Sequence, residues 1–206
     1  MEGEHRRSRE ARQDDDGLAV GSLGGLAAAR RGECDLAPIH LFDDRTQTYN
    51  TPFLSEGLEL VPGWRRMQGI VFRPGDTRFE GKSAEDALAA ALGDPACMMV
   101  NRNQGAGTRI LIDKLLGQAR PDGYWNQPRS HNAVAAAVVQ RRADWGVTIA
   151  PVARATGLVF TALTEEHYDF ALVSVRKSRP AVQAFLAALQ SHASRIAMEE
   201  AGFRPA

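Results

Sequence analysis

The stretch LAVGSLGGLAAARRGECDLAPIHL, residues 18–41, decides the fold. It begins with the short apolar run Leu18–Val20 and continues into the small polar turn Gly21–Gly25. Strong helix formers follow from Leu26, and a glycine then supplies a stop. Residues 34–41 form a compact apolar run that is typical of a buried strand. The order of strand, turn, helix and strand predicts a βαβ unit, and therefore an α/β fold with parallel strands.

A second segment repeats this plan 109 residues further along the chain. There the polar turn Ser130–Asn132 begins an Ala-rich helix, and Asp144 precedes the strand Trp145–Ile149. The first segment has Asp35 at the matching position. Two copies of one unit indicate two lobes that are built alike. We place lobe I at residues 18–72 and 174–206, lobe II at residues 73–173, and a charged, disordered tail at residues 1–17.

The rest of the chain supplies further strands and helices. The apolar runs predict four strands, at Leu58–Val61, Met67–Phe72, Leu158–Leu163 and Tyr168–Val173. Pro62-Gly63 separates the first two, and Arg65 and Arg66 flank a crossover strand in this interpretation. Helices are predicted over residues 84–92, 110–116, 131–140, 180–189 and 194–200, with Ser83 and Ser130 as N-caps.

Composition excludes several classes of protein. The chain has 206 residues, with 25 basic and 25 acidic side chains, so its net charge of zero argues against a general polyanion binder. No stretch approaches the roughly 18 apolar residues that cross a bilayer, and no signal-peptide pattern opens the chain. Paired-carboxylate, nucleophile–base and metal-ligand spacings are also missing from the sequence. We therefore expect a cytoplasmic protein that is not an enzyme, with no catalytic residues, no metal and no membrane partner.

Three small polar turns each lead into a helix, at Ser22–Gly25, Gly105–Thr108 and Ser130–Asn132. The N-terminus of a helix presents unpaired N–H groups and partial positive charge, so it attracts anions. A single Ser, Thr or Asn at such a position is usually an ordinary N-cap. Three such turns at the carboxyl ends of strands would meet where open α/β sheets bind their ligands. This convergence favours an anion site, with neutral donors dominating the binding.

Several blocks of the sequence together resemble the type II periplasmic-binding-protein superfamily, in particular its molybdate-binding-like branch. The blocks are Gly21–Leu26, Gly32–Leu41, Tyr49–Leu54, Trp64–Gly69, Asn101–Arg109, His131–Ala135 and Ala143–Gly146. The resemblance covers about residues 18–190 and implies a two-lobe α/β fold with mixed sheets and a hinge, and an oxyanion in the cleft. The family fold begins with a further βα unit where this chain has its charged tail, so we expect that first unit to be lacking.

The resemblance also implies which residues bind the anion. Ser22 and the amides of Leu23 and Gly24 would form one part of the site. Gly107 and Thr108 would form a second part, with Arg109 closing on the anion. A third part would consist of Ser130, His131 and Asn132, and Tyr168 would reach in from its strand.

The function that these inferences support is binding of a molybdate- or tungstate-like oxyanion by a cytoplasmic substrate-binding or sensor domain. No cofactor is expected beyond this ligand, and nucleic acid would be contacted only through a fused or separate regulator domain. Two alternatives stay open. In the first alternative, the chain is the effector-sensing part of a transcriptional regulator. In the second, it is an enzyme on the same fold that is linked to molybdenum cofactor assembly.

Overall fold

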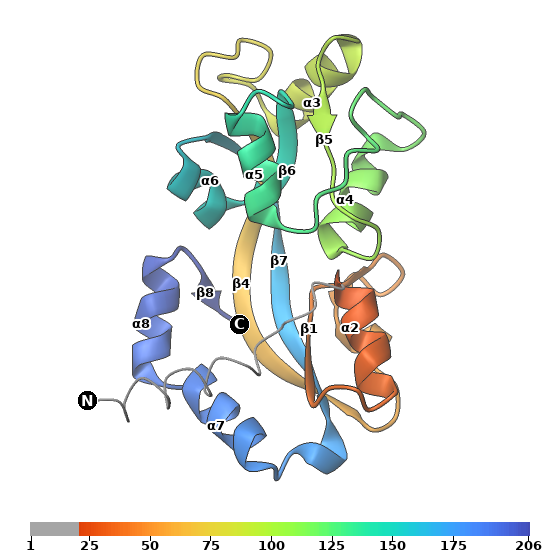
Figure 1. Cartoon of the computed structure of the whole chain (residues 1–206), viewed down its shortest axis with the longest axis vertical. Coiled ribbons are helices and arrows are strands. Elements are labelled where there is room, and N and C mark those ends of the chain that lie inside the picture. The colour runs from red at the N-terminus through yellow and green to blue at the C-terminus, as the bar shows by residue number, and fades with distance from the viewer. Residues whose placement is uncertain (1–20) are drawn as a thin grey trace, which may run out of the picture.

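The computed structural model describes residues 21–206, which fold into two α/β lobes joined by two long strands (Figure 1). The lower lobe contains α2 (Gly21–Arg30), β1 (Leu36–Ile39), β2 (Phe42–Asp43), β3 (Thr48–Tyr49), η1 (Thr51–Phe53), η2 (Ser174–Arg176), α7 (Pro180–Leu189), α8 (His192–Glu200) and β8 (Arg204–Pro205). The upper lobe contains α3 (Ala84–Gly93), β5 (Met99–Val100), α4 (Gly107–Leu116), α5 (His131–Val139), β6 (Trp145–Ile149) and α6 (Ala150–Thr156). The predicted α/β class is confirmed, whereas the tail at 1–17 and the run Leu18–Val20 lie outside the described residues.

The long strands β4 (Leu58–Phe72) and β7 (Val159–Val173) pair antiparallel along their whole length and run through both lobes. The prediction of four separate strands is therefore wrong. Pro62-Gly63 forms a bulge between Val61 and Trp64 rather than a break. A proline is tolerated at a bulge because it has no N–H to donate. Its neighbour must be glycine, since a Cβ there would lie 2.3 Å from the Tyr168 carbonyl oxygen.

Each lobe adds its own strands to this pair. β1 pairs antiparallel with the C-terminal half of β7, and β6 pairs antiparallel with the C-terminal half of β4. β5 pairs parallel with β6, so the strand order is β1-β7-β4-β6-β5. The mixed sheet that the family resemblance implied is confirmed. The parallel pairing predicted for the βαβ unit at residues 18–41 involves Leu18–Val20, which lie outside the described residues. The charged tail, where we expect the family's first βα unit to be lacking, lies outside them as well.

The 109-residue correspondence holds in three dimensions. β1 begins at Leu36 and β6 begins 109 residues later, at Trp145. Asp35 binds Arg176 at 2.8 Å, and Arg176 also donates to the carbonyl oxygen of Cys34 at 3.2 Å. In the upper lobe Asp144 binds Arg73 at 2.7 Å, and Arg73 donates to the carbonyl oxygen of Ala143 at 2.6 Å. In each lobe, therefore, an arginine that follows a long strand holds the helix–strand turn, and a second arginine also pairs with the aspartate.

Helix starts differ from the prediction at two places. α2 begins at Gly21 rather than Leu26, and α4 begins at Gly107 rather than Ile110. Glycines are poor helix formers, but close packing at these starts outweighs that preference. The bounds of β6 and α7 and the side-chain caps of Ser83 and Ser130 agree with the sequence prediction.

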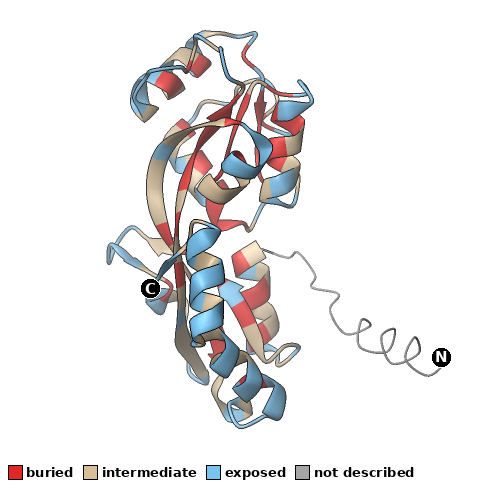
Figure 2. Cartoon of the chain, turned by 90° about the vertical axis from the view of Figure 1, so that its left-hand side faces the viewer, coloured by how far each residue is buried: buried red, intermediate tan, exposed pale blue. Residues whose placement is uncertain are grey.

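The core fills both faces of the sheet in the upper lobe (Figure 2). Ile70 and Phe72 of β4 pack with Trp145 on one face, and Val71 packs with Val134 on the other. A smaller cluster lies in the lower lobe and consists of Leu26, Ile39, Leu41 and Ala171. Because β4 and β7 take part in both lobes, their middle residues lie between the two cores.

Removing one arginine clamp should destabilise the protein. The variants Arg73→Ala and Arg176→Ala each remove charged hydrogen bonds from partly buried carbonyl groups and a carboxylate, so each should cost about 2 kcal/mol of unfolding free energy. Urea denaturation measures this loss. Arg142→Ala, at an exposed position, is the control and should change stability by no more than about 0.5 kcal/mol. A clamp variant as stable as this control would contradict the structural role of the clamp.

Candidate functional site

Two helix starts from different lobes contact each other at the middle of the molecule. The Leu23 amide in α2 donates to the Gly105 carbonyl oxygen at 3.4 Å, just before α4. Ser22 Oγ accepts from the His40 amide at 3.2 Å. A Cβ on Gly107 would lie 2.2 Å from the His40 carbonyl oxygen, so only glycine allows this approach. The predicted convergence of the Ser22 and Gly107–Thr108 turns is therefore seen in the structure.

A buried carboxylate, Glu166 of β7, lies at the centre of this region. It accepts hydrogen bonds from Arg66 Nε, from Gln68 Nε2, and from His40 Nδ1 at 3.0 Å. Burial alone would raise its pKa, but the nearby His40 and Arg66 outweigh burial and lower the pKa of Glu166 to about 2. The carboxylate is thus ionised at physiological pH and neutralises the guanidinium of Arg66.

A second buried arginine, Arg102, lies close enough to feel both Arg66 and Glu166. Burial, followed by repulsion from Arg66, lowers the pKa of Arg102 to about 10, so it stays cationic at neutral pH. Its Nη2 donates to the Arg129 carbonyl oxygen at 3.2 Å. Its Nε and Nη1 are buried and have no hydrogen-bond partner within residues 21–206. A buried guanidinium that bonds no carboxylate among the described residues is costly, so the region is suited to an anion.

Two more polar atoms share this situation. Thr108 Oγ1 in the first turn of α4 and His131 Nδ1 in the first turn of α5 are buried, and neither contacts a hydrogen-bonding group of the described chain. Burial, together with Arg66 and Arg102, lowers the pKa of His131 well below its usual value, so the ring is neutral. His131 is close enough to Arg66, Arg102 and Glu166 for their charges to affect its pKa. The start of α5 therefore lies in the same region as the starts of α2 and α4.

The other predicted site residues have different surroundings. Ser130 is exposed and caps α5 by accepting from the Ala133 amide at 3.1 Å, and Asn132 is exposed beside it. Leu23 is exposed and Gly24 is half-buried. The Tyr168 ring stacks on His40, and the guanidinium carbon of Arg66 lies 4.5 Å from the centre of the Tyr168 ring.

Arg109 is engaged within the upper lobe. It binds Asp113 at 2.8 Å, the Tyr124 hydroxyl at 2.6 Å and the Arg102 carbonyl oxygen at 3.1 Å. All three guanidinium nitrogens are used in this way, so the interior of the upper lobe holds this arginine in place.

Sequence reasoning did not identify Arg102, Glu166 or Gln68 as site residues. The pattern offered one signal, since polar residues interrupt the apolar runs of both long strands. The sequence predicts a break at Pro62-Gly63, which places Arg66 beside a strand rather than within one. Besides the neutral donors that we expect to dominate the binding, two buried arginines, Arg66 and Arg102, lie among the helix starts.

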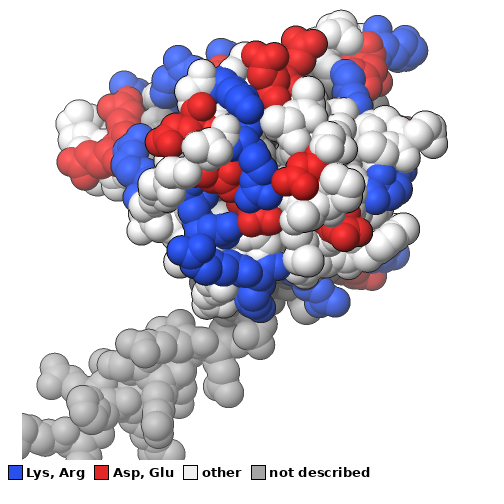
Figure 3. Space-filling model, turned by 90° about the horizontal axis from the view of Figure 1, so that it is seen from above, with Lys and Arg blue, Asp and Glu red and all other residues white. Residues whose placement is uncertain are grey.

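In residues 21–206, His, Cys, Asp and Glu nowhere gather in a group of three that could hold a metal ion. Of the helices that the structure describes, none is long and apolar enough to cross a membrane. The face shown in Figure 3 carries Lys and Arg side chains interspersed with Asp and Glu side chains.

Sequence comparison shows relatives of this chain. A family model described as a PBP superfamily domain matches residues 13–190. The uncharacterized protein YvgK of Bacillus subtilis (strain 168) is 28% identical over 181 residues, which are 83% of this chain and 56% of that protein. The chain thus spans little more than half the length of this relative.

Solved structures share the fold at low sequence identity. A putative phosphate ABC transporter substrate-binding protein with bound phosphate, from Clostridium perfringens, has a TM-score of 0.67 at 12% identity, covering 91% of this chain and 85% of that one. The tungstate ABC transporter from Geobacter sulfurreducens has a TM-score of 0.63 at 16% identity, covering 88% and 83%. A probable transcriptional regulator from Pseudomonas aeruginosa has a TM-score of 0.56 at 16% identity, covering 80% and 52%.

These similarities confirm the two-lobe fold and the superfamily that the sequence blocks indicated. The family match extends over most of the chain, from the charged segment to the end of α7. On this basis the chain belongs to the PBP-like domain family of the PBP superfamily.

Proposed function

We propose that this protein binds a small tetrahedral oxyanion between its lobes, with molybdate or tungstate as the first candidates, and that it acts by binding rather than by catalysis. The observation that carries the proposal is the group of buried polar atoms of Arg102, Thr108 and His131 that lack partners in the part of the chain that the structure describes. These atoms lie at or near helix starts, where backbone N–H groups also favour an anion.

The charges of the region support an anionic ligand. Arg66 is matched by Glu166, whereas Arg102 has no carboxylate bonded to it among the described residues. An oxyanion would supply that missing counter-charge and accept from Arg102 Nε and Nη1. Ser22 Oγ accepts from the His40 amide, so its own O–H remains available as a further donor.

The proposed mechanism is closure of the lobes on the ligand. Donors come from α2 in the lower lobe and from α4 and α5 in the upper lobe, so one anion can contact both. A ligand that binds the closed arrangement more tightly than the open one shifts the population toward closure. The similar structures of a tungstate transporter and of a phosphate-binding protein support an oxyanion as the ligand. We propose that the protein itself is cytoplasmic.

A second candidate is the sensor part of a transcriptional regulator. The similar regulator from Pseudomonas aeruginosa favours it, since the chain spans 52% of that protein and the remainder of such a protein could contact DNA. In both candidates the oxyanion site is the same, so the test of the ligand serves both.

A panel of oxyanions tests the proposal directly. Molybdate or tungstate at about 100 times its dissociation constant should add roughly 2.7 kcal/mol to the unfolding free energy, because it binds only the folded chain. Thermal unfolding with molybdate, tungstate, sulfate and phosphate measures this effect. A response to sulfate or phosphate alone would reject molybdate and tungstate, and no response to any of the four would reject the oxyanion site.

Replacement of one unpaired donor separates binding from stability. Thr108→Val removes a hydroxyl that bonds nothing in the described structure, so the ligand-free stability should be unchanged while oxyanion affinity falls about tenfold or more. Thr156→Val is the matched control, since Thr156 Oγ1 bonds the Val152 carbonyl oxygen on α6, away from the site. Calorimetric titration gives both affinities. Equal affinity of Thr108→Val and Thr156→Val would contradict the assignment of Thr108.

A further inference from the structure

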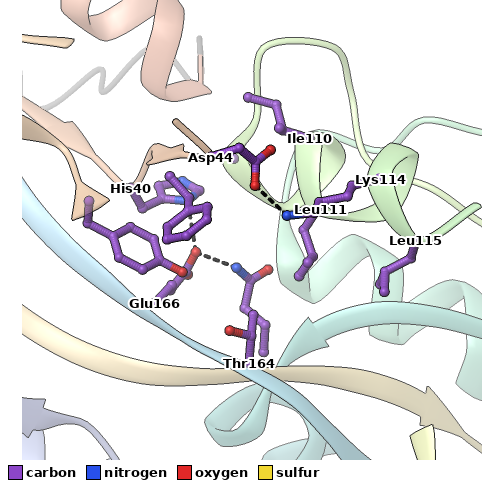
Figure 4. Close-up of a pocket in the computed structure, with 12 residues that line it drawn as sticks. His40, Asp44, Ile110, Leu111, Lys114, Leu115, Thr164 and Glu166 are labelled. Carbon is purple, nitrogen blue, oxygen red and sulfur yellow. Dashed lines mark hydrogen bonds and ion pairs between the residues drawn. The ribbon is translucent and has the colours of Figure 1, made fainter. Parts of the chain in front are cut away.

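A cavity of about 220 Å³ opens beside the proposed anion site, between the lobes (Figure 4). Its lower-lobe wall consists of Phe42 and Tyr49, from the β2–β3 hairpin. Its upper-lobe wall consists of Ile110, Leu111 and Leu115, all on one side of α4. His40, Gln68, Thr164 and Glu166 also line the cavity, so it has an apolar side and a polar side.

The aromatic wall presents rings rather than polar groups. Phe42 and Tyr49 pack against each other with their ring centres 5.0 Å apart and their planes tilted by 58°. The Tyr49 hydroxyl is already used, because it donates to the Glu165 carbonyl oxygen at 2.9 Å. Rings in this arrangement contact another ring favourably, either offset or edge to face.

One atom on the polar side of the cavity lacks a partner. Gln68 is 3% exposed, and its Nε2 donates to Glu166. Because an ionised carboxylate only accepts, the amide nitrogen must face Glu166 and the amide oxygen must face away from it. That oxygen, Gln68 Oε1, is buried and accepts no hydrogen bond from any residue between Gly21 and the C-terminus. A buried acceptor in this position requires a donor.

The charges around the cavity are already matched. Glu166 is bonded by Arg66 and by His40. Lys114 forms an ion pair with Asp44 at the cavity, and this pair links α4 to the loop after β2 with both side chains exposed. A charged ligand in the cavity would disturb these pairs, whereas a neutral ligand would leave them intact.

We propose that this cavity binds a neutral aromatic molecule of one or two rings that donates one N–H or O–H to Gln68 Oε1. An apolar cavity of about 150 Å³ is enough for benzene, so a cavity of about 220 Å³ accommodates a somewhat larger ring system. The site uses the β2–β3 hairpin, the middle of α4 and Gln68. Arg102, Thr108 and His131 do not line this cavity, whereas Gly107 and Glu166 do, so the cavity adjoins the proposed anion site. Neutral probes test it independently of the oxyanion proposal.

A matched pair of probes tests the donor. Indole and benzofuran have nearly the same size and shape, but only indole carries an N–H. Titration calorimetry of the full chain should give an indole affinity at least about tenfold higher than that of benzofuran, because only indole satisfies Gln68 Oε1. Equal affinities would overturn the role of Gln68, and failure of both probes to bind would overturn the site.

A cavity-filling variant tests the location. Leu111→Trp places a large side chain in the cavity and should abolish indole binding, whereas Leu92→Trp, at an exposed position on α3, should retain it. Thermal unfolding and far-UV circular dichroism show whether each variant is folded. Indole binding that survives in folded Leu111→Trp would overturn the location. If that variant does not fold, the comparison of indole with benzofuran on the unmodified chain decides the proposal.

Discussion

The antiparallel register of β4 against β7 places Arg66 directly opposite Glu166. Their side chains form a buried ion pair at the point where the two lobes meet. Such a pair adds little net stability, because desolvation of both charges offsets their attraction. The pair forms only in this register, since a slip by one residue would move every side chain of the strand to the opposite face of the sheet. The chemistry of the region between the lobes depends on this register.

The charge balance of the proposed site follows from that pair. Glu166 neutralises Arg66. It also accepts a hydrogen bond from Gln68, so the amide nitrogen of Gln68 faces the carboxylate. Arg102 lies close by but is bonded to a carbonyl oxygen rather than to an acid. The result is one compensated arginine and one arginine whose charge is unmatched among the described residues. This distinction between the two arginines is the physical basis for proposing an anion at Arg102.

The two lobes repeat one structural unit around the long strands. Ser22 and His131 occupy matching positions, 109 residues apart, at the first turns of α2 and α5. Asp35 with Arg176, and Asp144 with Arg73, hold the opposite ends of the two units in the same way. A single plan used twice therefore points two helix starts at the same region, and α4 adds a third. In the proposed closure, the long strands β4 and β7 would bend between the two lobes, because they are the strands that run through both.

The sequence by itself determined the local structure and the class of fold. The caps at Ser83 and Ser130, the strand Trp145–Ile149 and the helix Pro180–Leu189 follow from short-range patterns, because capping and periodicity depend on neighbouring residues. The repeated unit was also visible, since both copies lie in the chain as continuous segments.

Only the tertiary structure decided the continuity of β4 and β7 and the composition of the site. The bulge at Pro62-Gly63 reads as a turn in one dimension, and becomes part of a strand only because β7 lies beside it. Arg66 and Glu166 are 100 residues apart, so no local pattern joins them. Among residues 21–206, Arg102 bonds a carbonyl oxygen but no carboxylate, and this too depends on its surroundings rather than on its neighbours in the sequence. Pairing between distant strands sets which polar groups are satisfied, and therefore which remain available to a ligand.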